Sequence, residues 1–145
     1  MQITSELEYE LETHKQKLVN EGEDYNTIDA FRLIDLSGQG AVNQQEIFDF
    51  LLRNFANYKF TQHELDLFMI RFDKYDKQKI KYSEFCQAFA PQEAQSQQLL
   101  VQRQPNNTQL EKSYEQIFSA RTRELFEQTW KMHFISESII EQMRQ

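Results

Sequence analysis

The sequence predicts an all-α protein, and three observations support this. The chain of 145 residues has only three glycines and two prolines, a composition that suits long helices better than loop-rich β structure. Its apolar residues recur at steps of three and four, as on one face of a helix. A helix–loop–helix unit also occurs twice, with loops that open at Asp35 and Asp73, 38 positions apart. This repeat predicts two copies of one helical hairpin, with a further helix before them and another after them.

Four segments follow from this pattern. Residues 1–24 are predicted to form an acidic helix, and residues 25–91 the paired hairpins. Residues 92–118 are rich in glutamine and lack periodicity, which predicts an extended linker. Residues 119–145 are predicted to form one long amphipathic helix that starts at a serine cap.

The first predicted helix carries an apolar stripe and a strong negative charge. Thr4 or Ser5 is suited to cap it, and Leu7, Leu11 and Leu18 lie at helical spacing. Seven acidic residues stand against two lysines in this segment, a surplus of five negative charges. A solvated helix face or a surface for a basic partner both fit this charge.

The helices of the paired hairpins have recognisable start and stop signals. Capping residues accept hydrogen bonds from the first free amides of a helix, and proline ends a helix at the residue before it. The signals are the periodic span from Thr27 to Ile34, the cap Asn43, the capping box of Thr61 and Glu64, and a start near Ser83 with a stop before Pro91.

The first loop has the frame of a calcium site. Calcium in helical proteins takes oxygen ligands from positions 1, 3, 5, 7, 9 and 12 of a loop with glycine at position 6. Gly40 occupies position 6, and only the first and last of the six ligand positions carry a charge, which predicts weak affinity at about 10⁻⁴ M or worse. The six candidate ligands are Asp35, Ser37, Gln39, Ala41 (through its carbonyl), Asn43 and Glu46.

The second loop keeps the acidic ends, Asp73 and Glu84, but loses the ligands between them. Tyr75 stands at position 3, Lys77 at position 5 and Gln78 at position 6. A divalent cation would have to enter beside an ammonium group, so the sequence predicts that this loop does not bind calcium. Two orientations of Lys77 remain open. Its ammonium group either turns inward and replaces the ion, or points outward into water.

Residues 27–91 resemble an EF-hand pair of the calmodulin superfamily, on the strength of the two loop frames. The resemblance implies that Val42 and Ile80, at position 8 of their loops, face each other in a short antiparallel strand pair. The expected fold is therefore an EF-hand pair with an N-terminal helix and a long C-terminal helix added.

The C-terminal helix carries an aromatic ridge formed by Phe126, Trp130 and Phe134. Residues four apart lie on the same helix face, and tryptophan is frequent at interface centres, so these three are the candidate partner-binding residues. The helix is expected either to fold back onto the groove of its own pair or to project and bind another protein.

The stretch that follows the pair resembles EF-hand proteins of cilia and flagella. It consists of "YSEFCQAFAPQ", a glutamine-rich spacer with "RQPNN", and the helix "FSARTRELFEQTWKMHFISESIIEQMRQ". In those proteins an EF-hand pair precedes an arginine–proline linker and a long terminal helix. The resemblance implies a structural protein of the axoneme, associated with microtubules.

Composition argues against several other classes of protein. A net charge of −7 disfavours nucleic-acid binding, and no apolar run is long enough for direct membrane insertion. No phosphate loop, zinc-ligand spacing or catalytic constellation occurs, so we expect no enzyme and no cofactor other than weakly bound calcium at the first loop. The single cysteine, Cys86, cannot form an internal disulfide, and no secretory signal is visible. These features predict an intracellular location, with the axoneme favoured and the cytoplasm as the alternative.

The sequence thus predicts a largely calcium-insensitive adaptor that docks to proteins in a stable assembly. One alternative is a weak calcium sensor of the calmodulin or light-chain type that uses the first loop alone. Another is a subunit of a different intracellular or organellar complex.

Overall fold

The computed structural model describes residues 4–55, 58–75, 77–105 and 113–144. It confirms an all-α EF-hand-type fold with a small two-stranded sheet. The elements are α1 (Ser5–Asn20), α2 (Thr27–Ile34), β1 (Ala41–Asn43), α3 (Gln44–Asn54), α4 (Gln62–Phe72), β2 (Lys79–Lys81), α5 (Tyr82–Phe89), α6 (Ala94–Gln102), α7 (Tyr114–Ile117) and α8 (Ala120–Met143).

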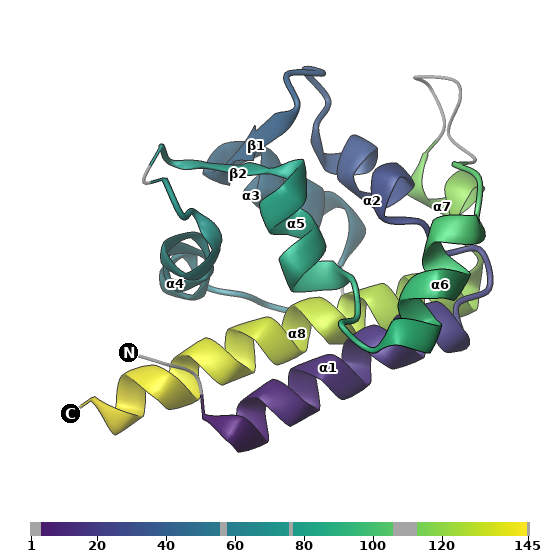
Figure 1. The fold of residues 1–145 in the computed structure, drawn as a ribbon. Coiled ribbons are helices and arrows are strands. Elements are labelled where there is room, and N and C mark those ends of the chain that lie inside the picture. Colours follow the sequence, from purple (N-terminus) through teal and green to yellow (C-terminus); the bar gives the residue numbers. More distant parts are fainter. Residues whose placement is uncertain (1–3, 56–57, 76, 106–112, 145) are drawn as a thin grey trace.

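The helices form two layers (Figure 1). Helices α1 and α8 lie side by side along the bottom of the view and run in opposite directions, so that the start of α1 and the end of α8 are both at the left. The helices α2 to α5 and the two short strands lie above them, while α6 and α7 gather at the end where α1 leads into α2. The core lies between the layers.

The two short strands couple the two loops. Strands β1 and β2 pair antiparallel, with Val42 directly opposite Ile80. Both side chains are fully buried, so the pairing also contributes to the core. The strand pair expected from the resemblance is therefore confirmed.

The predicted capping residues occupy their expected places. Asn43 Oδ1 accepts the Glu46 amide at 2.8 Å, and Thr61 Oγ1 accepts the Glu64 amide at 3.1 Å. Both glutamates return a hydrogen bond to the amide of the capping residue, which completes two capping boxes. Ser119 caps α8 as predicted.

Helix α1 belongs to the same core as the paired hairpins. Thr4 caps it, and the predicted stripe of Leu7, Leu11 and Leu18 is buried. Leu18 and Val19 are completely inaccessible and join the central cluster of apolar residues. Glu6 and Glu8 of the first turn are exposed, whereas Glu12 on the next turn accepts the amides of Gln92 and Glu93.

The prediction of an extended linker over residues 92–118 is wrong for the part that the structure describes. Ala94–Gln102 forms helix α6 and Tyr114–Ile117 forms helix α7. The side chain of Glu93 accepts the first free amides of α6, and Leu100 is buried against the rest of the chain. Tertiary packing therefore stabilises helices where the sequence has little periodicity.

Arg103, at the end of α6, closes the C-terminus of α1. Its Nη2 donates to Val19 O at 2.7 Å, and its Nη1 donates to Gly22 O at 2.9 Å and Tyr25 O at 3.0 Å. The last carbonyls of a helix lack an intrahelical donor, so the guanidinium supplies one to Val19 O, while Gly22 O also accepts the Tyr25 amide at 3.0 Å. A Cβ atom at Gly22 would lie 2.4 Å from Leu18 O, which explains why glycine occupies the turn beneath the guanidinium.

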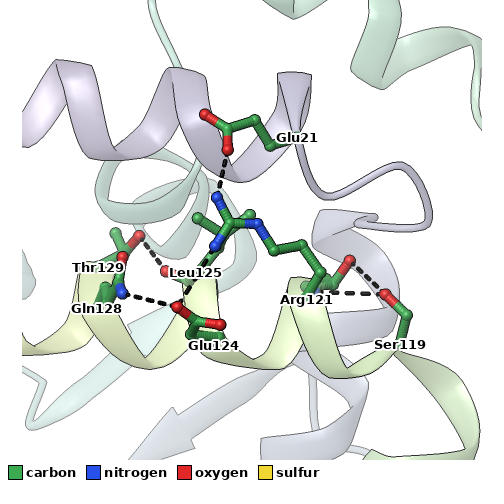
Figure 2. A network of polar contacts seen from close by, with 8 residues as sticks. Glu21, Ser119, Arg121, Glu124, Leu125, Gln128 and Thr129 are labelled. Atoms are coloured by element: carbon green, nitrogen blue, oxygen red, sulfur yellow. Dashed lines mark hydrogen bonds and ion pairs between the residues drawn. The ribbon is translucent and has the colours of Figure 1, made fainter.

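The N-terminus of α8 is held by the same turn. The Asp24 carboxylate accepts the Ser119 amide at 2.7 Å and also the Thr122 hydroxyl. A negative charge at a helix N-terminus is favourable because it meets the free amides and the positive end of the helix dipole. Figure 2 shows Arg121 reaching across from α8 to form an ion pair with Glu21 at the end of α1.

His133 lies inside the core, on the face of α8 that meets α4 and α5. Its ring packs edge-on to Phe68, Phe72 and Phe89, and its Nε2 donates to Ala88 O at 2.7 Å. Burial disfavours the imidazolium form and lowers the pKa of His133 to about 3. The neutral ring is therefore the form that fits the fold.

We predict that His133 makes the protein sensitive to acid. Because its pKa is lower in the folded state than the ordinary 6.5, its contribution to stability is complete above pH 6.5 and is lost as pH falls towards 3. The loss from this residue is about 1.4 kcal/mol per pH unit within that window. Chemical denaturation between pH 7 and 4.5 should give a flatter slope for His133→Gln, and parallel slopes for variant and wild type would contradict the prediction.

Candidate functional site

The first loop brings three of its six predicted ligands together. The Ser37 hydroxyl lies 3.1 Å from Glu46 Oε2 and 3.5 Å from Asp35 Oδ1. Oxygens from loop positions 1, 3 and 12 therefore converge on one small volume, and Asp35 is buried at its inner side. This is the part of the chain where an oxygen-seeking cation would fit best.

The other three predicted ligands of this loop have different partners. Asn43 Oδ1 caps helix α3 by accepting the Glu46 amide. Gln39 Oε1 accepts a hydrogen bond from Lys79 Nζ of the second loop at 3.4 Å. Ala41 lies in strand β1 opposite Lys81. The structure therefore brings together three of the six ligands that the loop frame predicts.

Backbone amides of the same loop already donate hydrogen bonds to the carboxylate of Asp35, the first residue of the loop. Asp35 Oδ1 accepts the Gln39 amide at 3.1 Å, and Oδ2 accepts the Gly40 amide at 2.8 Å. Gly40 adopts a left-handed conformation with φ of 80°, which turns the chain so that these amides point inward.

The second loop repeats this arrangement without glycine. Asp73 Oδ1 accepts the Lys77 amide at 3.1 Å, and Oδ2 accepts the Gln78 amide at 2.6 Å. Gln78 takes the left-handed conformation that Gly40 takes in the first loop, with φ of 59°. A residue with a Cβ atom is strained in that conformation.

The closing glutamate of the second loop is also satisfied by the main chain. Glu84 is buried, and its Oε1 and Oε2 accept the amides of Lys81 at 2.9 Å and Lys74 at 2.7 Å. Hydrogen bonds to a carboxylate are stronger than those between neutral groups. Four backbone amides therefore hold the two carboxylates of this loop.

The structure overturns the inward orientation of Lys77. Its side chain is exposed and forms no ion pair with Asp73 or Glu84 among the described residues. Nearby amides reach both carboxylates at lower entropic cost than a long flexible side chain would. Tyr75 is also exposed, and its ring lies 4.8 Å from Lys81 Nζ.

These geometries decide how well calcium fits each loop. The first loop offers Asp35, Ser37 and Glu46, a hard-oxygen set of the kind calcium prefers but with only two charges. The second loop offers two carboxylates already bonded to amides, surrounded by lysines, and this set does not fit a divalent cation. Within the described ranges, no group of three or more histidine, cysteine or acidic side chains could hold a metal ion.

The aromatic ridge of α8 lies inside the molecule. Phe126, Trp130 and Phe134 are fully buried, and the Trp130 ring centroid lies 4.6 Å from that of Phe89 and 4.9 Å from that of Phe68. The prediction that these three residues bind a partner protein is wrong, because the paired hairpins already enclose them. Of the two predicted arrangements, the helix adopts the one folded back onto its own chain.

Two ion pairs fix the far half of α8 against α4. Glu137 accepts Arg71 Nε at 2.8 Å in a largely buried contact, and Glu141 pairs with His63 Nε2 at 2.6 Å at the surface. The contact with Glu141 raises the pKa of His63. These contacts run along the rim of the aromatic interface, so α8 is held along most of its length.

Sequence reasoning missed the residues that lock the two layers together. The sequence places Arg103 in the predicted linker, and Asp24 is one of seven acidic residues in the first segment. Arg103 stands two residues before Pro105 and is the only positively charged residue between Phe89 and Lys112, which is its one local signal. For Asp24 no local signal exists, because its partners lie about a hundred residues away.

Comparison with known proteins identifies one region. Residues 25–90 match the family model described as an EF-hand domain pair. No curated protein and no solved structure matches the chain significantly. No helix in the described part of the chain is long and apolar enough to span a membrane.

Replacing Gln78 with glycine should stabilise the protein. Glycine removes the strain of the left-handed conformation but adds freedom to the unfolded chain, so we expect a gain of up to about 1 kcal/mol in the free energy of unfolding. Urea denaturation measures it. Lys77→Ala is the control and should leave the melting temperature unchanged, because the loop uses the amide of Lys77 rather than its ammonium group. A lower melting temperature for Lys77→Ala would mean that the ammonium group of Lys77 does stabilise the loop from inside.

Truncating Trp130 should destabilise the fold severely. Trp130→Ala removes the largest side chain of the core, and such changes cost about 3–5 kcal/mol. Ile135→Ala on the exposed face of the same helix is the control, with an expected change of about 0.5 kcal/mol or less. Equal effects in thermal unfolding would mean that α8 does not pack into the groove in solution.

Proposed function

Because residues 25–90 form an EF-hand domain pair, a fold of the calcium-binding type, we propose that the protein is an adaptor whose conformation depends little on calcium. EF-hand pairs are in general regulatory or binding modules, and we propose no catalytic role for this one. The chain would serve as a preformed building block in a stable protein assembly.

The observation that carries this proposal is the burial of the α8 ridge. Calcium sensors of this fold expose an apolar groove when they open and then bind a target helix. Here Phe126, Trp130 and Phe134 of the same chain occupy the corresponding apolar surface. Because α8 already fills the groove, calcium is not required to form the groove or to expose it.

The loops support the same interpretation. Asp73 and Glu84 are satisfied by four main-chain amides, so the second loop keeps its shape without an added cation. The strand pairing of Val42 with Ile80 couples the first loop to it. A rigid second loop therefore restrains any rearrangement that weak binding at the first loop would cause.

For the location and partners of the adaptor, we propose protein assemblies of the ciliary axoneme associated with microtubules. This part of the proposal rests only on the sequence resemblance of residues 27–145 to EF-hand proteins of cilia and flagella. A subunit of another stable intracellular or organellar complex is the alternative, and it would use the same closed structure.

A weak calcium sensor is the second candidate function, favoured by the converging oxygens of Asp35, Ser37 and Glu46. Binding there would replace the hydrogen bonds of the Ser37 hydroxyl with contacts to the ion. The two candidates differ in the calcium concentration required and in whether α8 moves.

We expect calcium to bind, if it is supplied in excess, with a Kd of about 10⁻⁴ M or weaker, because the first loop has only two charged ligands. Isothermal titration calorimetry measures the affinity, and Glu46→Gln is the variant that should abolish the residual heat. Trp130, the only tryptophan, reports on the groove, and its emission should not change on addition of calcium. A change at micromolar calcium that a chelator reverses would establish the sensor instead.

A further inference from the structure

We propose that the lysine-rich face of the second loop is a docking surface for an acidic, extended segment of a partner protein. The surface, called here the lysine face, consists of Tyr75, Lys77, Lys79 and Lys81, with Lys74 at its edge. The inference deepens the proposed adaptor function, on which it rests, by naming a surface and the chemistry of what binds there.

The loop geometry directs these lysines outward. The carboxylates of Asp73 and Glu84 bind four backbone amides, and three of these belong to Lys74, Lys77 and Lys81. Because the main chain of these three lysines is anchored inward, their side chains are free to face solvent, and Lys79 in strand β2 is exposed as well. In an ion-binding loop of this fold, the residues at the positions of Asp73 and Glu84 bind the ion. Here they fix the backbone that carries the exposed lysines.

The cationic charge of this surface is not neutralised within the described chain. None of Lys74, Lys77, Lys79 and Lys81 forms an ion pair with a described residue. Among the described residues, Lys79 Nζ donates to the neutral Gln39 side chain at 3.4 Å, and Lys81 Nζ lies over the Tyr75 ring. Residues 74–81 hold four lysines and one aspartate, a net charge of +3 in a chain of net charge −7, so this local surface has the opposite sign.

Strand β2 sets the distance between the side chains of Lys79 and Lys81. Ile80 is fully buried, while Lys79 and Lys81 on either side of it are exposed, so both point to the same outer face. Side chains two positions apart in a strand stand roughly 7 Å apart. Carboxylates at alternate positions of an extended segment have the same spacing, so one such segment can pair with both lysines.

Two features favour a protein partner over a membrane or a nucleic acid. Tyr75 is 63% exposed beside Lys81 and adds an aromatic side chain of the type enriched at protein interfaces. The net charge of −7 repels anionic membranes and nucleic acids as a whole, whereas a short acidic segment contacts only the local surface. Preorganisation by the amide–carboxylate bonds lowers the entropy cost of binding.

The test uses the full chain, in chelator at low salt, with two labelled peptides of identical composition. One alternates glutamate with serine, and the other has all its glutamates in one block. Fluorescence anisotropy should show tighter binding of the alternating peptide. Lys79→Gln with Lys81→Gln should weaken that binding roughly tenfold. The matched control is Lys17→Gln with Lys59→Gln, two exposed lysines elsewhere, and it should leave binding nearly unchanged.

Three results would overturn the proposal. Equal binding of the two peptides would remove the role of the strand spacing, and equal loss in both double variants would reduce the effect to net charge. Tighter binding to phosphatidylserine vesicles or duplex DNA than to the alternating peptide would assign the surface to another class of partner. Because calcium is absent from the assay, each result is independent of the calcium test of the proposed function.

Discussion

The packing of Trp130 against Phe68 and Phe89 is the contact on which the remaining structure depends. It places α8 in the apolar groove of the paired hairpins, and the opposite side of α8 then provides the surface against which α1 lies. Arg103 and Asp24 tie the ends of those two helices to the turn between α1 and α2. Without α8 in the groove, α1 would lose its neighbour and the aromatic core would be open to water.

The two loops show that the acidic residues at the ends of such a loop can be satisfied in two ways, by a bound ion or by backbone amides. In a calcium site the acidic ends are neutralised by an ion, and the loop changes shape when the ion leaves. Here Asp73 and Glu84 meet backbone amides, which are part of the chain and always present. The first loop stands between the two cases, because Asp35 has amide partners while Ser37 and Glu46 still converge beside it. Calcium at that loop would compete with existing hydrogen bonds rather than create order.

Most of the fold could be predicted because its signals are local. The capping boxes at Asn43 and Thr61 and the frame of the first loop depend on residues within a dozen positions of each other. The outward direction of Lys77 could not be predicted, because sequence does not reveal that amides would reach Asp73 first. Helix α6 was missed for a related reason, since the burial of Leu100 depends on elements distant in the chain. For the aromatic ridge of α8, spacing identified the face correctly but could not identify what covers it.

A closed groove also limits how a partner can bind. A segment tethered within its own chain competes at an effective concentration in the millimolar range, so an external helix at micromolar concentration would need roughly a thousandfold higher intrinsic affinity to displace α8. Displacement would in addition expose Phe126, Trp130 and Phe134, which are completely buried. Partners are therefore expected on the outer surface, where the acidic face of α1 and the lysine face of the second loop present opposite charges on different elements. The proposed adaptor function therefore requires binding through charge and shape at the surface, with the core unchanged.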